Sequence, residues 1–438
     1  DIKLEFNKQG KIKDNFIING FIKDGKLSFH KKYNIDKINF IFDLKKNGLV
    51  ISDTNFNLDN LNFYSDEISV SRKANIFSIK GEIDHKKLNL NNSKLDIFIK
   101  RFFGNLEYKE LSLSSKNTFS FNLSKKFKLT DLEIFSKIKL TEFSVLNNYD
   151  LKDFFPQIKE KITFLNNDLE IKYKKDRLSL IGGGKILLQD NSDKISYKLE
   201  KLKRNLKFES SIKVDDNPLN IDLLNYSKEE DVAIDFKGII KNDEIFLNLF
   251  SLKETDKNLN IYELEFNKKK QIKSIGKIDL DYLDNYGQKN LISLIKKNKR
   301  YILKGSYFNA DNLIKKIINN EEENPNIINI DSSLEVKIDK VGIDENNKLS
   351  DLNGSLVFKN QNIINGNLEG FFAENEKFKL TVNTSENKKI TTLFLDRAEP
   401  IVKRYKFIKG FKGGKLDYYS SSNGKETSST LKIYDFKL

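Results

Sequence analysis

The chain has 438 residues, of which 38% are hydrophobic and 32% are charged, and its formal net charge is +14. Its 34 Phe and 16 Tyr residues exclude a disordered chain, because so much aromatic surface has to be buried. The absence of Cys excludes a disulfide framework, a thiolate zinc site and a thiol nucleophile. Length alone does not fix the number of domains, since all-β arrays often form long single units.

The positive charge comes mainly from lysines spread among Asn, Ile and Asp, a composition typical of biased codon usage. A nucleic-acid site would instead favour clustered Arg beside stacking aromatic residues. Basic clusters occur at 268–270 and 296–300, and we interpret both as solvated ends of strands or helices. We therefore expect no nucleic-acid partner, while anionic lipid headgroups stay open as phosphate-bearing partners.

Targeting and membrane signals are absent from the sequence as it stands. No apolar run approaches the roughly 20 residues that a membrane-spanning helix needs, and no signal peptide opens the chain. The first residue is Asp1 and not an initiator Met. We therefore expect a segment of a longer protein, whose anchor or targeting sequence lies upstream.

Apolar and polar residues alternate from one end of the chain to the other. Because successive side chains on a strand point to opposite faces, this pattern predicts strands with one apolar face. Turns rich in Asn, Asp, Gly and Lys separate the runs, so an antiparallel meander is the simplest topology. The clearest runs are 2–6, 38–44, 119–123, 169–173, 195–199, 219–223, 232–236, 334–338, 378–382 and 431–433.

Pairs of polar residues interrupt this alternation and shift its phase at 59–60, 109–110, 130–131 and 350–351. β-Bulges produce such a shift, and they curl a sheet. We therefore expect an all-β fold with a few short helices, in which a long antiparallel curled sheet forms an elongated open groove with an apolar concave face. A sheet closed into a sandwich or barrel would bury the same face, and the pattern alone favours neither arrangement.

Three stretches have the apolar spacing of helices, at 150–161, 280–299 and 309–320, and the first contains Pro156. We expect them to cap or plug the sheet. The polar, Pro-bearing run 321–326 is the best linker candidate. The predicted division is an N-terminal part of the groove at 1–147, a middle part with short helices at 148–308, and a C-terminal region at 309–438.

Residues that could carry chemistry are sparse. His30 and His85 are far apart and flanked by Lys, so we interpret them as solvated strand or turn residues. Gly182 to Gly184 precede Lys185 without a phosphate-loop frame and predict a bulge or sharp bend. The acidic runs 229–231 and 321–323 lack the spacing of a calcium loop and predict solvated turns. We expect no enzyme, no catalytic residue, no metal and no cofactor.

The candidate binding surface is the apolar face itself, because contiguous exposed apolar surface of this extent usually marks a binding function. The residues predicted to line it are Phe40, Phe42, Phe121, Leu169, Ile171, Ile234, Leu334, Val336, Leu356, Phe358, Leu368, Leu380 and Val382.

The stretch 390–438 combines a short amphipathic helix at 398–407, a Gly-rich turn and two alternating strands joined by the polar run 420–427. Upstream, a repeating pattern of strands has Leu or Gly at fixed positions, and these positions are Leu349, Leu352, Gly354, Leu356, Leu368 and Gly370. In these features, residues 310–438 resemble the C-terminal region of the AsmA-like family, the YhdP- and TamB-type envelope proteins of bridge-like lipid transfer. The matching residues near the end are Ile401, Val402, Tyr405, Phe407, Ile408, Gly413, Gly414, Leu416, Leu431, Ile433, Asp435, Phe436 and Leu438.

This resemblance implies a periplasmic segment, tethered to the inner membrane through a part of the protein outside this chain. It implies that phospholipid acyl chains lie in the groove and move between the inner and outer membranes, with envelope proteins as further partners. The stretch 150–162 also resembles a helix that precedes this region in larger members, although its Trp is missing. Two alternatives stay open: a scaffold or chaperone for outer-membrane protein assembly, and a surface adhesin-like structural protein.

Overall fold

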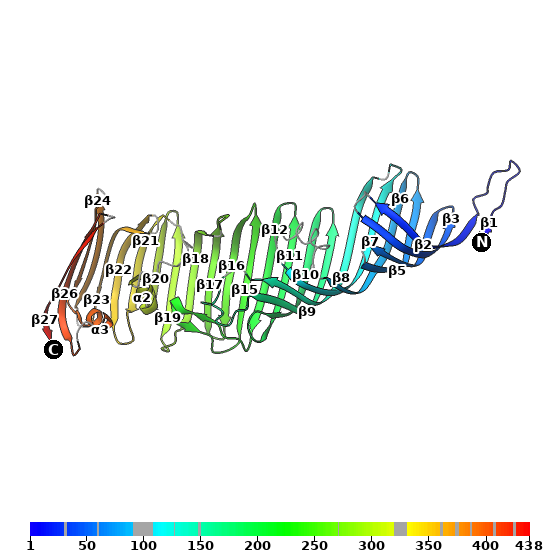
Figure 1. Ribbon diagram of the computed structural model, residues 1–438. Helices are drawn as coiled ribbons and strands as arrows, with labels where there is room; N and C mark the ends of the chain where they lie inside the picture. The colour runs from blue at the N-terminus through cyan, green and yellow to red at the C-terminus, as the bar shows by residue number, and fades with distance from the viewer. Residues whose placement is uncertain are drawn as a thin grey trace. The chain divides into compact units, whose positions relative to one another are not determined.

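The computed structural model describes residues 1–29, 33–58, 61–90, 108–126, 128–147, 150–269, 271–318, 331–359, 362–372, 376–385, 388–405, 409–423 and 426–438. Within these ranges the chain is almost entirely β-strand (Figure 1). The helical elements described there are α2 (Asp311–Ile318), α3 (Glu399–Tyr405) and the short 3-10 helix η1 (Asp222–Leu224). None of these helices has the length and apolar character needed to cross a membrane. The predicted all-β class with a few short helices is confirmed.

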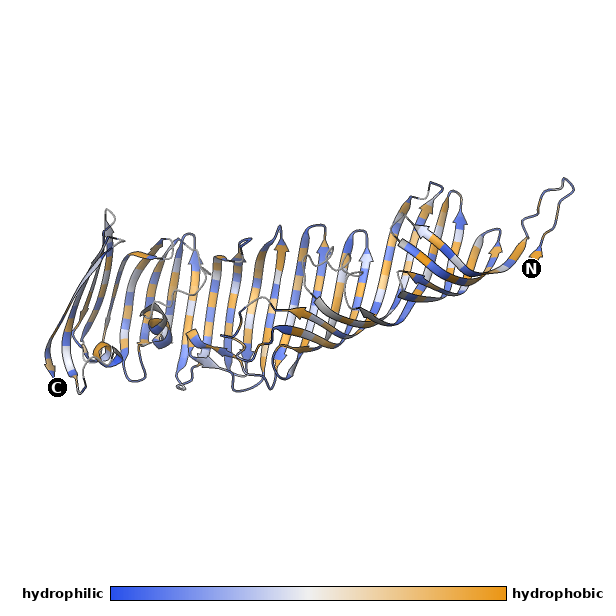
Figure 2. Cartoon of the chain, in the orientation of Figure 1, coloured by the Kyte–Doolittle hydropathy of each residue, from blue (hydrophilic) through white to orange (hydrophobic). Residues whose placement is uncertain are grey.

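The strands form one 25-stranded sheet that is not closed, and a separate pair, β13 (Asn220–Ile221) and β14 (Tyr226–Ser227). Described neighbours pair antiparallel, except β20 (Arg300–Asn309) and β21 (Ser332–Gly342), which are parallel and are connected through α2. Figure 2 shows hydrophobic and hydrophilic residues alternating along the strands, as expected for a sheet with two different faces.

Contacts divide the chain into two compact units, which we call the N-terminal unit (1–150 and 157–212) and the C-terminal unit (151–156 and 213–438). The division into 1–147, 148–308 and 309–438 stays a prediction. The N-terminal unit contains β1 (Ile2–Lys3), β2 (Ile17–Phe29), β3 (Tyr33–Lys45), β4 (Gly48–Leu58), β5 (Leu61–Lys73), β6 (Ile76–Leu90), β7 (Tyr108–Ser124), β8 (Leu129–Leu146), β9 (Lys161–Lys174), β10 (Arg177–Leu187), β11 (Ser192–Leu202) and most of β12 (Asn205–Val214).

The C-terminal unit continues the meander. Its remaining sheet strands are β15 (Val232–Lys241), β16 (Glu244–Glu254), β17 (Lys257–Phe266), β18 (Ile272–Leu283), β19 (Lys289–Lys297), β22 (Lys348–Lys359), β23 (Asn362–Phe371), β24 (Lys377–Ser385), β25 (Lys388–Leu395), β26 (Lys412–Ser422) and β27 (Thr427–Lys437).

Three of the four predicted bulges are confirmed. Strand registers shift beside 109–110, opposite 130–131 and at 350–351. Asp131 and Asp351 have φ values of 54° and 53°, in the left-handed region that Asp tolerates better than most side chains. The bulge predicted at 59–60 lies outside the described residues, and the flanking Leu58 and Leu61 pair with each other as neighbours on β4 and β5. The bulge expected in the glycine run is also present, between Gly183 and Lys185.

The helix predictions had mixed outcomes. The helices expected at 309–320 and 398–407 are present as α2 and α3. The helix expected at 280–299 is wrong, because these residues form the hairpin of β18 and β19. There Ile292 and Leu294 pair with Leu280 and Ile278, while Leu291 stays 45% exposed. Apolar partners on the neighbouring strands determine that this segment forms strands and not a helix. The periodicity of the sequence carries no information about those partners.

The helix expected at 150–161 is also wrong. One turn forms there, in which the N–H of Phe155 donates to the carbonyl of Leu151 over 2.8 Å. Pro156 follows, has no N–H to continue the pattern, and is succeeded by β9 from Lys161. The linker candidate 321–326, the acidic run 321–323 and His30 lie outside the described residues.

Gly354 occupies a backbone position that excludes any side chain. Its φ is 150°, and a Cβ built there would lie 1.9 Å from the carbonyl oxygen of Asn367 on β23. We expect Gly354→Ala to lower the free energy of unfolding by more than about 2 kcal/mol, measured by urea titration. The control is Gly287→Ala, with φ 70° and no atom within 4 Å, which should cost only about 1 kcal/mol of backbone strain. Equal losses would contradict the close approach of the two strands.

Candidate binding surface

An unbroken apolar row crosses the C-terminal unit from β15 to β27. Each member lies directly opposite the next on the neighbouring strand, so all of them share one face, which we call the apolar face. Most members are half-buried. The central row consists of Phe236, Phe250, Ile261, Ile278, Leu294, Leu303, Val336, Gly354, Leu368, Leu380, Leu393, Tyr418 and Leu431.

The opposite face of the same strands carries a mainly polar row, although Phe394 in that row is 47% exposed and Leu291, Ile295 and Tyr419 on the same face are also exposed. The residues next to the central row along each strand form a second set of directly opposite partners. This set consists of Asp235, Ser251, Asn260, Asp279, Ser293, Lys304, Lys337, Asn353, Glu369, Lys379, Phe394, Asp417 and Lys432. Neighbours in this row bond to each other, as when the Ser293 hydroxyl donates to Asp279 over 2.8 Å and Lys379 pairs with Glu369 at 2.7 Å. Along these two rows the sheet of this unit therefore has one apolar and one mainly polar face, with Phe394 as the exception.

A second apolar row lies two residues further along each strand of the apolar face. It includes Leu252, Leu259 and Ile338, which are buried. Ile338 belongs to one hydrophobic core with Ala310, which immediately precedes α2, and with Val402 of α3. The two helices thus cap one side of the apolar face, as the sequence predicted for 309–320, while the central row stays partly accessible.

The N-terminal unit repeats the pattern. Ile18, Leu44, Leu49, Val70, Ile79 and Phe121 lie opposite one another from β2 to β7. Beside them runs a second row of Gly20, Phe42, Ile51, Ile68, Gly81, Phe119, Ile134, Tyr173 and Leu178, which reaches β10. This unit therefore also has an apolar face.

The structure places the residues that the sequence selected on these two faces. Phe40, Phe42, Phe121, Leu169 and Ile171 share the face of the N-terminal unit, by register and by alternation along their strands. The other eight share the face of the C-terminal unit. Three of them, Ile234, Val336 and Val382, are only 2%, 6% and 7% exposed, so they support the sheet and offer a ligand little surface. Contact of the others with lipid stays a prediction.

A buried polar cluster centred on Glu254 was not foreseen from the sequence. Glu254 lies on the apolar face at the end of β16 and is 1% exposed. Its carboxylate accepts hydrogen bonds from the Tyr226 hydroxyl over 2.7 Å and from the N–H groups of Glu229 and Glu230, both over 2.6 Å. Lys257 lies 3.3 Å away and also bonds to Glu229 over 2.9 Å. This cluster fastens the segment 217–231, which we call the strap, to the sheet.

The electrostatic interactions in this cluster favour the charged forms of Glu254 and Lys257 and the neutral form of Tyr226. Burial by itself raises the pKa of Glu254, but the bonds from Glu230, Tyr226 and Glu229, with the charge of Lys257, outweigh burial and hold that pKa below its ordinary value. Burial likewise opposes the charge of Lys257, but Glu229 and Glu254 raise its pKa. Burial first, and then the bond to Glu254, raises the pKa of Tyr226, so its hydroxyl remains a donor. The only sequence signal for this cluster was the acidic run 229–231, whose side chains are exposed as predicted.

The strap, α2 and α3 are linked to each other although they are remote in sequence. Asn312 of α2 donates to the carbonyl of Asp222 in the strap over 2.6 Å, and Tyr282 donates to the carbonyl of Leu224 over 2.9 Å. Arg404 of α3 pairs with the buried Asp311 of α2 and donates to the carbonyl of Ile343 over 2.8 Å. Together these elements follow one side of the apolar face.

A second buried carboxylate, Asp284, organises the sheet beside α2. It accepts bonds from the N–H groups of Tyr286 and Gln288 and from the side-chain amides of Asn290 and Asn309. The side chain of Asn309 in turn accepts the N–H of Asp311 over 3.1 Å, at the start of α2. These contacts fix the position of α2 and offer no free ligand atom to a substrate. In the described ranges, no group of His, Asp and Glu side chains is arranged to hold a metal ion.

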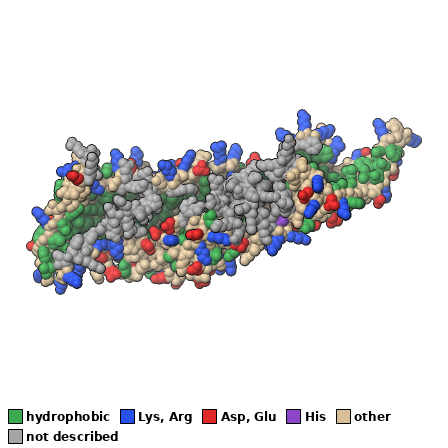
Figure 3. All heavy atoms as spheres, viewed as in Figure 1, with side chains coloured by type: hydrophobic (Ala, Val, Ile, Leu, Met, Phe, Trp, Pro, Cys, Tyr) green, Lys and Arg blue, Asp and Glu red, His purple; other side chains and the backbone are tan. Residues whose placement is uncertain are grey.

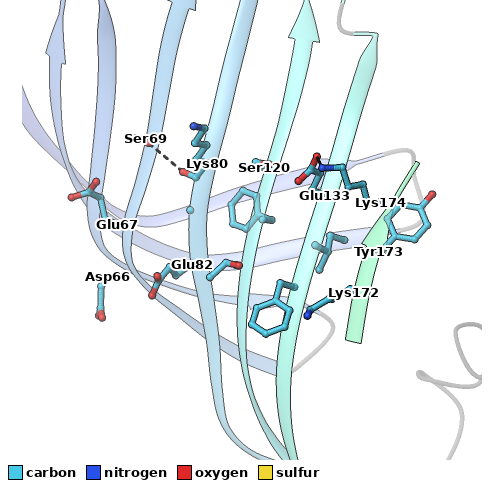
Figure 4. A pocket seen from close by; sticks show the side chains of 15 residues that line it. Asp66, Glu67, Ser69, Lys80, Glu82, Ser120, Glu133, Lys172, Tyr173 and Lys174 are labelled. Carbon is cyan, nitrogen blue, oxygen red and sulfur yellow. Dashed lines mark hydrogen bonds and ion pairs between the residues drawn. The ribbon is translucent and has the colours of Figure 1, made fainter. Parts of the chain in front are cut away.

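The N-terminal unit also contains the buried His85 and a hollow lined mainly by polar residues. The prediction that His85 is solvated is wrong: it is 7% exposed, packs against Phe63, and its Nδ1 lies 2.5 Å from the carbonyl oxygen of Asn62. The hollow has a volume of about 720 Å³ and lies mainly on the polar face of β5 to β9 (Figure 4). Its lining carries charges of both signs, and Glu133 of β8 pairs with its neighbour Lys174 of β9 at 2.7 Å, so the hollow does not select a ligand of one charge.

No family model, no curated protein and no solved structure matches this chain. The resemblance of residues 310–438 to the AsmA-like family therefore rests on the residues named above.

Proposed function

We propose that the apolar face of the sheet binds the acyl chains of phospholipids and lets them move along it without any chemical step. The observation that carries this proposal is the apolar row from Phe236 to Leu431, which continues through β15 to β27 with a polar row behind it. Each methylene group that leaves water for such a surface contributes roughly 0.8 kcal/mol. A row without a polar interruption gives a sliding chain no single position at which it has to stop.

The proposed shape of this surface is an elongated open groove with an apolar concave face. The bulges at Asp131 and Asp351 support it, because left-handed residues inside strands bend a sheet. Further left-handed residues occur within strands at Asp53, Asn166 and Glu263. Figure 3 shows hydrophobic side chains gathered over the end of the chain that carries β23 to β27.

The proposed setting follows from the resemblance of residues 310–438 to AsmA-like proteins. It is the periplasm, with a tether to the inner membrane outside this chain, and transport of phospholipids between the inner and outer membranes. Envelope proteins would be the partners at the ends of the sheet. In this setting the polar face and its lysines lie in water, while acyl chains occupy the apolar face.

The experiment that tests this function is lipid analysis of the purified chain. The protein is isolated without detergent from cells, extracted with organic solvent, and the extract is quantified by mass spectrometry. We expect phospholipid in at least a one-to-one molar ratio with protein. A protein that carries no lipid, and that gains none from phospholipid vesicles, would contradict the proposal. Extraction of bound polypeptide in place of lipid would favour a scaffold for outer-membrane proteins.

A further inference from the structure

The two borders of the apolar face in the C-terminal unit differ in structure. Because neighbouring strands run in opposite directions, the turns fall on two opposite borders. We call one the capped border: it contains the turns 254–257, 283–289, 342–348 and 371–377, the segment 395–412, the strap and the start of α2. It is the lower edge of the C-terminal unit in Figure 1, where α2 and α3 are labelled. There the strap, α2 and α3 cover the second apolar row.

The capped border has no excess of positive charge among its described residues. Three of its carboxylates are paired, Glu254 with Lys257, Asp311 with Arg404, and Glu399 with Lys403 at 2.5 Å. Others, such as Asp222, Asp256 and Glu345, are exposed. An anionic headgroup placed there would meet these carboxylates and would have to pass over the strap or a helix. This border therefore offers neither space nor net charge to a phosphate group.

The opposite border, which we call the basic border, consists of the turns 241–244, 267–271, 297–300, 359–362, 385–388 and 422–427. Its described basic residues are Lys241, Lys268, Lys269, Lys297, Lys299, Arg300, Lys359 and Lys388, against the acidic Asp243, Glu244 and Glu426 and against Asp331, which precedes β21 on the same border. All eight basic residues are exposed. Figure 3 shows lysine and arginine side chains along the upper edge, where these turns lie.

We infer that the C-terminal unit holds anionic phospholipids in one orientation, with the acyl chain on the central apolar row and the phosphate headgroup at the basic border. This inference rests on the proposed function. The capped border excludes the headgroup, while the lysines of the other border neutralise it, and near an anionic surface each such residue contributes appreciably. The ligand class is therefore an anionic glycerophospholipid, in preference to a zwitterionic one.

The first test reverses charge on one border at a time. The variant Lys297→Glu, Lys299→Glu, Lys359→Glu, Lys388→Glu changes the basic border. The matched control Lys289→Glu, Lys377→Glu, Lys409→Glu, Lys412→Glu makes the same change with exposed lysines of the capped border. Binding is measured with fluorescent phosphatidylglycerol and phosphatidylcholine in the full chain.

We expect the basic-border variant to bind phosphatidylglycerol about tenfold more weakly, with phosphatidylcholine bound as before and the control close to the parent protein. The loss should shrink as salt is added. Equal loss in both variants, or none in either, would overturn the orientation while leaving lipid binding itself intact. Failure of the parent protein to bind any lipid would instead overturn the proposed function.

The second test locates the headgroup directly. The chain contains no Cys, so a single Cys can be labelled without background. Lys359→Cys places a fluorophore on the last residue of β22, and Glu345→Cys places one in the turn before its first residue; the 12 residues of the strand span roughly 40 Å. A phosphatidylglycerol with a nitroxide on its headgroup should quench the label at 359 several-fold more than the label at 345. Equal quenching, or stronger quenching at 345, would overturn the inference.

Discussion

Glu254→Ala should lower the free energy of unfolding of the C-terminal unit by about 3 kcal/mol, because it removes the buried carboxylate beside the buried Lys257 and leaves that ammonium only the exposed Glu229 as a partner. The same change removes the acceptor for Tyr226 and for the N–H groups of Glu229 and Glu230. The strap would lose its polar attachment to the sheet. We expect an earlier urea transition and binding of a hydrophobic dye where Leu252 and Leu259 become accessible.

Two controls separate this cluster from ordinary surface charge. Glu229→Ala removes a side chain that is 71% exposed and should cost at most about 1 kcal/mol. Glu254→Gln keeps the shape and an acceptor oxygen but not the charge, so its cost should lie between the two. A loss below about 1 kcal/mol for Glu254→Ala would show that the strap is held by its apolar contacts alone.

The same carboxylate gives the stability a pH dependence. The folded-state pKa of Glu254 lies below the ordinary value of 4.5, so its stabilising contribution is complete above that pH. The contribution is lost as pH falls through the depressed folded-state pKa, when the carboxylate takes up a proton. The unfolding free energy of the parent protein should therefore fall below about pH 4.5 more steeply than that of Glu254→Gln.

Replacing Leu356 and Leu368 together by Asp should reduce the phospholipid carried by the purified protein at least about tenfold. Both side chains are half-buried on the apolar face of β22 and β23, where under the proposed function a carboxylate would face the acyl chain and would have to be desolvated. Lipid content per protein molecule, determined after organic extraction, is the measurement.

The matched control is Ser355→Asp with Asn365→Asp. These residues lie on the same two strands but on the polar face, and both are exposed. The control should retain its lipid, and circular dichroism should show unchanged strand content in both variants. Equal lipid loss in the two proteins would mean that the charge acts through the stability of the sheet and not through the apolar face.

The two-faced sheet could be predicted because alternation is a local property. Leu334, Leu356, Leu368 and Leu380 were selected from runs on separate strands, and the register brings them onto one face. Side chains alternate between the two faces of a strand, so once one strand is aligned with its neighbour, the face of every residue on it is determined. The bulge at 350–351 was predictable for the same reason, since it changes the phase of the alternation.

The buried polar clusters could not be predicted, because they join residues that the sequence keeps far apart. Tyr226 bonds to Glu254, Asn312 bonds to the carbonyl of Asp222, and Arg404 pairs with Asp311. Each of these contacts depends on the packing of the strap and the helices on the sheet. The helix prediction for the segment 280–299 was wrong for a related reason. Its Leu and Ile residues fit a helical stripe, but as a strand Leu294 lies between Ile278 and Leu303, and Ile292 lies between Leu280 and Gly305.

A photoreactive amino acid placed in turn at Leu380 and at Lys379 tests the central claim most directly. These neighbours on β24 point to the apolar and the polar face, since Leu380 lies opposite Leu368 and Lys379 opposite Glu369. After irradiation in cells, the proposed function predicts phospholipid attached at position 380 and none at position 379. Equal labelling at both positions, or attached polypeptide without lipid at 380, would contradict it.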